Sequence, residues 1–156
     1  MAAPSPEPLA SLFVKQQADL IRETRAVARD VLAPIARAGE PGRVNRALVQ
    51  ALGDHGLLPR LFGGRDEPTG DVSALELCIL REALAQESTE SETAFALQGL
   101  GTYPVIQGGQ EHIVRRWAPL VARGEAVAAF ALTEPGADPT RPPSSSWPRG
   151  GGADTG

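Results

Sequence analysis

The sequence has a single cysteine, Cys78, among its 156 residues. One thiol cannot form a disulfide within the chain, and a chain without disulfides is typical of a reducing compartment. We therefore expect a cytoplasmic protein. Cys78 lies inside an apolar helical pattern, where a free cysteine usually serves as a small core side chain. The prediction for Cys78 is a buried structural thiol.

Positive charge is also scarce. The chain has 15 Lys and Arg against 19 Asp and Glu, a net charge of -4, and its nearest approach to a basic patch is the pair Arg115 and Arg116. Nucleic-acid-binding domains usually carry a basic stripe, so we expect no nucleic acid partner. The longest apolar run, residues 126–132, is far too short to span a bilayer. Residues 1–9 carry an acid and prolines, unlike the basic start of a signal peptide.

Aromatic residues make up only 4% of the chain, whereas apolar residues of all kinds make up 42%. The core must then consist mainly of Leu, Val, Ile and Ala, a composition that favours packed helices. The length suits about one domain. The two histidines, His55 at a helix end and His112 on an exposed helix side, have no second ligand at metal spacing. We predict no metal site.

Helical periodicity covers most of the first 125 residues. Apolar residues recur at the three- and four-residue spacing of a helix face in several segments. These predicted helical segments are residues 9–38, 44–55, 71–87, 93–100 and 102–121. The chain should form a mainly α bundle of four to six helices, followed by one β-strand and a tail.

Several residues are expected to end or bend these helices. Pro34 should kink or end the first helix near residues 32–33, because proline lacks the backbone donor. Asp71 is a plausible N-cap, and residues 88–91 form a polar interruption. Gly99 and Gly101 should end the next helix. Pro104 would then lie in the first turn of a new one.

The run from Ala129 to Ala137, Ala-Phe-Ala-Leu-Thr-Glu-Pro-Gly-Ala, contains the most informative motif. It reads as a buried strand that breaks into a Pro-Gly turn and places the Thr133 hydroxyl at the strand end. A planar polar ligand could dock there. The run resembles the signature of flavin-dependent acyl-CoA dehydrogenases. That signature normally continues with Gly-Ser-Asp, whereas this chain continues with Asp-Pro-Thr at 138–140.

Weaker matches to the same family precede the signature in the family's order. They include a Leu-Ala-Pro-Ile-Ala segment, an Asp-His-Gly-Leu-Leu turn, a Phe-Gly-Gly loop and an Ala-Arg-Gly-Glu lead-in. The matching segments are residues 32–36, 54–58, 62–64, 81–85, 97–101, 108–111 and 122–125. Each is weak alone. Together, in order over residues 9–137, they identify the chain as similar to the N-terminal part of an acyl-CoA dehydrogenase.

The resemblance implies a chemistry. The family binds FAD and removes two hydrogens from the α and β carbons of an acyl-CoA, with a glutamate as base. By this likeness, Phe130, Leu132 and Thr133 bind the flavin, and Gln98 and Gly99 line the acyl pocket. Thr133 could instead only satisfy a strand-end turn, and the two pocket residues could form a plain helix end.

The catalytic residues of the family are not matched in this chain. The base lies in a C-terminal helical domain that has no counterpart here, and Glu134 is better explained as a turn carboxylate. We therefore expect a fragment that is inactive alone. The resemblance further implies an acyl-CoA substrate, and association either as a homo-oligomer or with a dehydrogenase subunit. The alternative function is a non-catalytic helical module that binds such a subunit.

The sequence divides into three parts. Residues 1–125 would form the helical domain, and residues 126–137 the first strand and signature of a middle β-domain. Residues 138–156 are rich in Pro, Ser and Gly and have no large aliphatic residue. Such a tail cannot offset its ordering entropy by burial, so we expect it to be disordered. It reads either as a frameshifted continuation of a dehydrogenase gene or as a genuine low-complexity tail.

Overall fold

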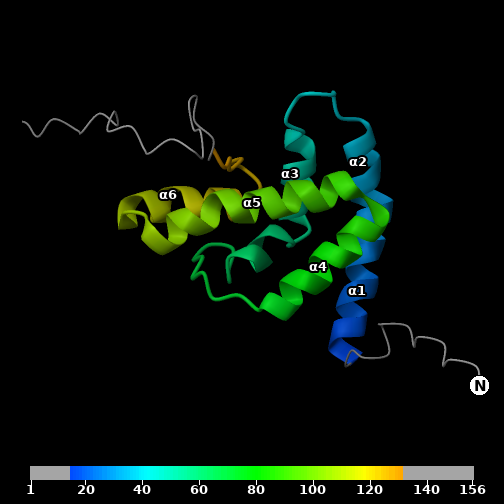
Figure 1. Ribbon diagram of the computed structural model, residues 1–156, viewed down its shortest axis with the longest axis horizontal. Coiled ribbons are helices and arrows are strands. Elements are labelled where there is room, and N and C mark those ends of the chain that lie inside the picture. The colour runs from blue at the N-terminus through cyan, green and yellow to red at the C-terminus, as the bar shows by residue number, and fades with distance from the viewer. Residues whose placement is uncertain (1–14, 132–156) are drawn as a thin grey trace, which may run out of the picture.

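The computed structural model describes residues 15–131, and within them the fold is built from helices (Figure 1). The predicted mainly α fold is confirmed. The tail at 138–156 lies outside the described residues. The elements in chain order are α1 (Lys15–Val27), η2 (Ala28–Leu32), α2 (Ala33–Arg37), α3 (Arg46–Asp54), η3 (Leu58–Leu61), α4 (Ala74–Glu87), α5 (Thr89–Gly108) and α6 (Glu111–Ala122).

The first three elements form one continuous helical rod from Lys15 to Arg37. η2 is a π-helical stretch that ends two residues before Pro34, and the Ala33 amide donates to the Ala28 carbonyl at its end. A wider turn accommodates the proline, which would clash with the carbonyl four residues earlier in a regular helix. The predicted disturbance near residues 32–33 is therefore present, but helical structure continues to Arg37.

α4 and α5 meet at a sharp break. Ser88 is extended, with φ -159° and ψ 106°, and its hydroxyl accepts a hydrogen bond from the Ser91 amide at 3.2 Å. The predicted polar interruption is thus the N-cap of α5. The start of α4 differs from its prediction. Ser73, not Asp71, caps it by accepting from the Glu76 amide at 3.3 Å.

α5 runs unbroken through Gly99, Gly101 and Pro104, so the prediction of a helix end there was wrong. The two glycines serve close packing instead. A Cβ on Gly99 would lie 3.2 Å from Leu61, and one on Gly101 would lie 2.9 Å from the Ala128 Cβ. Tertiary packing on both sides holds the helix through residues that would weaken it in isolation.

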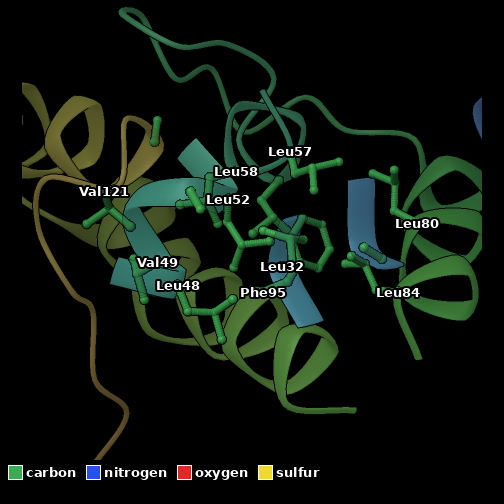
Figure 2. Packing of buried hydrophobic residues seen from close by; sticks show 14 of the residues in the cluster. Leu32, Leu48, Val49, Leu52, Leu57, Leu58, Leu80, Leu84, Phe95 and Val121 are labelled. Atoms are coloured by element: carbon green, nitrogen blue, oxygen red, sulfur yellow. The ribbon is translucent and has the colours of Figure 1, made fainter. Parts of the chain in front are cut away.

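The core lies where η2, α3, η3, α4 and α5 converge, and Figure 2 shows its members pointing toward one another. α4 packs against α1 and α5, and α6 packs against α5 and η3. The core is aliphatic as predicted, with two phenylalanines added. Its fully buried large side chains are Leu32, Leu52, Leu58, Phe62, Leu80, Leu84 and Phe95.

Cys78 is exposed, contrary to the prediction of a buried thiol. α4 buries Ile79, Leu80, Ala83 and Leu84, so Cys78 falls on its solvent side. The sequence signal misled because α4 has apolar residues on more than one face.

Residues 126–131 form no strand, so this part of the predicted strand was wrong; the remainder lies beyond the described residues. A strand requires a partner for its backbone groups, and the described part of the chain offers none. The segment packs against α5 instead. None of the helices in residues 15–131 combines the length and apolar character that a membrane crossing requires.

Candidate functional site

An apolar groove of about 800 Å³ runs between the α2–α3 loop, α3, the first half of α5 and residues 127–130. Its polar members lie mainly on the loop rim and on the first turns of α5. The apolar residues that line it are Ala36, Pro41, Val44, Leu48, Val49, Ala94, Leu97, Val127, Ala128, Ala129 and Phe130. Three of these, Val44, Leu97 and Phe130, are large and exposed.

Gln98 connects α5 to the far wall of this groove. Its side chain is only 3% exposed, and its Oε1 accepts a hydrogen bond from the Ala128 amide at 2.8 Å. This bond satisfies a backbone donor that a strand partner would otherwise take. Gln98 therefore holds residues 127–130 at one position along the length of α5.

Gly101 fixes how closely the two elements approach. A Cβ at this position would lie 3.1 Å from both the nitrogen and the oxygen of Ala129. Gln98 and Gly101 are three residues apart and share one face of α5. The Gln98 side-chain amide supplies the hydrogen bond to Ala128. The absence of a side chain at Gly101 allows α5 to approach Ala129 closely.

The segment is also anchored before it reaches the groove. Gly124 adopts φ 76° just after α6, the position where a glycine most often ends a helix. It lies so close to α3 that a Cβ would approach the Val49 carbonyl oxygen to 2.6 Å. Gln50 adds a side-chain hydrogen bond to the Arg123 carbonyl at 3.3 Å. The chain therefore leaves the helical bundle along a fixed path.

Ion pairs also hold the loop that follows α6. The Arg123 guanidinium pairs with Glu125 at 3.0 Å and with Asp66 at 3.2 Å. The hydrogen bond to Glu125 is the main cause that raises the pKa of Arg123, and Asp66 adds to it. Arg123 thus stays charged and holds the loop after α6 against the loop before α4.

The groove wall on the loop side is held by Asn45. Its Oδ1 accepts from the Leu48 amide at 3.0 Å and caps α3, while its Nδ2 donates to the Ile35 carbonyl at 2.9 Å. Both ends of this amide are therefore engaged by the protein. Glu40 and Arg43 lie on the exposed rim and pair with each other at 3.1 Å.

The structure brings together some of the predicted site residues. Gln98 and Phe130 both line the groove, and Phe130 is 45% exposed. Gly99 does not line it, because it faces Leu61 in the core. Leu132 and Thr133 lie outside the described residues. In residues 15–131 no group of His, Cys, Asp and Glu could hold a metal.

Sequence reasoning missed Gly101 and Asn45 as parts of the site. Gly101 was interpreted as a helix end, although its spacing from Gln98 was a signal that both could face one partner. Asn45 directly precedes α3, and asparagine is among the residues favoured at an N-cap. Its second bond to Ile35 could not be read from the sequence.

Comparison with protein families matches residues 15–125 to the family described as acyl-CoA dehydrogenase, N-terminal domain. Among curated proteins, a cyclohexane-1-carbonyl-CoA dehydrogenase of Geobacter metallireducens is 28% identical over 128 residues, covering 78% of this chain and 33% of the relative. A cyclohexane-1-carbonyl-CoA dehydrogenase of Syntrophus aciditrophicus is 27% identical over 118 residues, 72% of this chain and 30% of its own length. A probable acyl-CoA dehydrogenase of Bacillus subtilis is 34% identical over 94 residues, 57% of this chain and 15% of the relative.

The structure is thus a helical domain with an apolar groove beside residues 126–131, the exit segment that follows α6. The chain belongs to the acyl-CoA dehydrogenase family and comprises its N-terminal helical domain. It spans about a third or less of the length of these relatives.

Proposed function

We propose that this chain supplies one wall of the acyl-binding site of an FAD-dependent acyl-CoA dehydrogenase. The observation that supports this most directly is the groove. It lies where α5 meets the segment that opens the flavin signature, and its lining is mainly apolar. An apolar cleft with a few fixed polar groups is the usual form of a small-molecule site.

The acyl group of a CoA thioester is the proposed occupant of the groove. The two cyclohexane-1-carbonyl-CoA dehydrogenases among the relatives support an alicyclic acyl group as the first ligand to test. Leu97 contributes its side chain from α5, and Val49 contributes from α3 on the opposite wall. Gln98 is the proposed substrate-contacting residue of the predicted pair. Gly99 would act indirectly, by letting α5 approach Leu61.

FAD is the proposed cofactor, and it would accept the hydride from the substrate. Phe130 fits this role, because it lies at the groove edge with 45% of its surface open. The backbone near Phe130 is held in place by the Gln98 bond to Ala128. Leu132 and Thr133 would continue the contact beyond the described residues.

We assign no catalytic base to the described residues. Two carboxylates border the groove, Glu40 and Glu90. Glu40 is 77% exposed and paired with Arg43, whereas Glu90 lies in the first turn of α5 beside the Ser88 cap. A base must lie within hydrogen-bonding distance of the proton that it removes and be suited to abstract it. The isolated chain should therefore bind an acyl-CoA without oxidising it.

Calorimetric titration of the full chain with cyclohexane-1-carbonyl-CoA tests this proposal. The Leu97→Lys variant places a charge in the groove and should abolish binding. Leu100→Lys is a matched control, because Leu100 is exposed on α5 to a similar degree, 51% against 45% for Leu97, but does not line the groove. Equal binding by all three proteins would overturn the groove assignment. Turnover after addition of FAD and an electron acceptor would overturn the assignment of no base.

A second candidate function is a helical module that binds a dehydrogenase subunit. Ile113 and Trp117 favour it, because they lie on one side of α6 at 36% and 43% exposure. They are four residues apart on α6, which buries Ala118, Val121 and Ala122 rather than these two side chains. Co-expression with an intact dehydrogenase subunit tests this function. A complex that carries flavin and is lost in Trp117→Lys would support it, and chains that elute separately would contradict it.

A further inference from the structure

The amide of Gln98 is oriented without ambiguity by its partner. A backbone N–H can only donate, so the atom facing Ala128 must be the carbonyl oxygen of the side chain. The NH₂ group is consequently at the other end of the amide. Because the side-chain oxygen of Gln98 is bonded to Ala128, the NH₂ group is the part of this side chain that remains available to a ligand.

That NH₂ group has no acceptor within the part of the chain that the structure describes. The Ala128 bond is the one hydrogen bond that the Gln98 side chain makes there. Gln98 is 97% buried, since its exposed fraction is 3%, and it borders the groove. The Gln98 side-chain nitrogen is not among the fully enclosed polar atoms that lack a partner in residues 15–131. It therefore keeps access to solvent, and because Gln98 lines the groove, its free donor is available to a molecule that occupies the groove.

The other amide of the groove shows the contrast. Asn45 uses its oxygen for the Leu48 amide and its nitrogen for the Ile35 carbonyl. Its role is structural at both ends. Among the described groove residues, Gln98 thus combines deep burial, a fixed orientation and an unused donor.

We propose that Gln98 is a specificity-determining residue that selects an acyl group carrying a hydroxyl or carbonyl oxygen. The apolar walls hold the carbon skeleton, and the Gln98 amide donates to the oxygen. This inference rests on the proposed function, because it assumes that an acyl-CoA occupies the groove. The inference adds that the acyl group carries a hydrogen-bond acceptor for Gln98 besides the carbonyl oxygen of the thioester.

A matched ligand pair tests the inference on the full chain. Calorimetry at pH 8 would compare cyclohexane-1-carbonyl-CoA with its 4-hydroxy derivative, which differs by one oxygen across the ring. We expect the hydroxylated ligand to bind about five- to tenfold more tightly, the contribution of about one hydrogen bond. The side-chain ¹⁵N signal of Gln98 should move with the hydroxylated ligand and much less with the other.

Two variants of Gln98 distinguish the effect of its free NH₂ donor from the effect of its hydrogen bond to Ala128. Gln98→Glu keeps an oxygen for the Ala128 amide but has no donor when ionised, and Gln98→Met has neither. Both should bind the two ligands equally. Gln86→Met, an exposed position on α4, is the control and should keep the preference.

The outcomes distinguish the two proposals. Equal affinity of the unmodified chain for both ligands would overturn the specificity role while leaving the acyl groove intact. A preference that persists in Gln98→Glu and Gln98→Met would also overturn it. If neither ligand binds, the acyl groove and the specificity role fail together.

Discussion

Gln98 and Gly101 act on the same stretch of backbone by opposite means. One adds a hydrogen bond to Ala128 at 2.8 Å, and the other removes the atom that would collide with Ala128 and Ala129. Neither effect depends on hydrophobicity, so neither belongs to the core pattern. Single substitutions at this face of α5 should therefore report on the exit segment more than on the core.

Replacing Gly101 by alanine should lower the free energy of unfolding by about 1 kcal/mol. The new Cβ would lie 2.9 Å from the Ala128 Cβ, and overpacking of about 1–3 kcal/mol outweighs the gain in helix propensity of about 1 kcal/mol. Gly108→Ala is the matched control, because its Cβ would meet nothing within 4 Å. It should leave stability unchanged or raise it by about 0.5 kcal/mol. Urea denaturation measures the free energy of unfolding of both variants. An equal gain in stability for both would contradict the close contact between Gly101 and Ala128.

Thr102 is buried at 3% exposure, and its hydroxyl oxygen lacks a hydrogen-bond partner in the described structure. Thr102→Val removes the hydroxyl and keeps the shape, so stability should stay level or rise by up to about 1 kcal/mol. Ser91→Ala makes the opposite comparison, because the Ser91 hydroxyl donates to Ser88 at 2.8 Å. It should cost about 1 kcal/mol. A larger loss in Thr102→Val than in Ser91→Ala by thermal unfolding would be inconsistent with this account.

At the scale of elements, the boundary between α4 and α5 depends on one side chain. Ser88→Ala removes the N-cap of α5 and should cost about 1–2 kcal/mol. Ser73→Ala removes the cap of α4, where Ser73 is exposed, and should cost about 0.5–1 kcal/mol because water can replace the lost bond. Denaturant titration followed by circular dichroism measures both. A cost for Ser73→Ala that equals or exceeds that for Ser88→Ala would show that burial of the cap does not matter.

Local signals predicted element ends well where one residue decides the backbone. Two predicted helices ended at residues 55 and 121. In the structure α3 ends at Asp54 and α6 at Ala122, each two residues before a glycine with positive φ, Gly56 and Gly124. The same reasoning failed within α5, because Gly99 and Gly101 were interpreted by their propensity. Their actual role is set by Leu61 and Ala128, residues 38 and 27 positions away in the sequence. No local pattern carries that information.

At the scale of the whole molecule, the helical class and the family were predictable, and most of the site was not. The family resemblance came from short motifs in order, and the match over residues 15–125 confirms it. Phe130 and Gln98 were both named from the sequence, and the structure places both at one groove. The bond between Gln98 and Ala128 could not be predicted, because the segment was expected to pair as a strand.

Large apolar side chains remain exposed on several parts of the described domain, and two of these parts bear on the proposals. Leu97 and Phe130 border the groove, whereas Ile113 and Trp117 lie on α6. Substituting Trp117 by lysine should cost no more than about 1 kcal/mol, because Trp117 is 43% exposed and outside the core. Its contact with Arg116, 5.1 Å from the ring centroid, adds little at an exposed site. A loss above about 2 kcal/mol in chemical denaturation would mean that this face is covered in solution.

The central claim is that the groove beside Gln98 receives the acyl group. Chemical-shift mapping of the ¹⁵N-labelled full chain during titration with cyclohexane-1-carbonyl-CoA tests it most directly. The account predicts saturable shifts at the amides of Leu97, Gln98 and Ala128, with those of Ile113 and Trp117 unchanged. Shifts confined to α6, or none at the groove at saturating ligand, would contradict it.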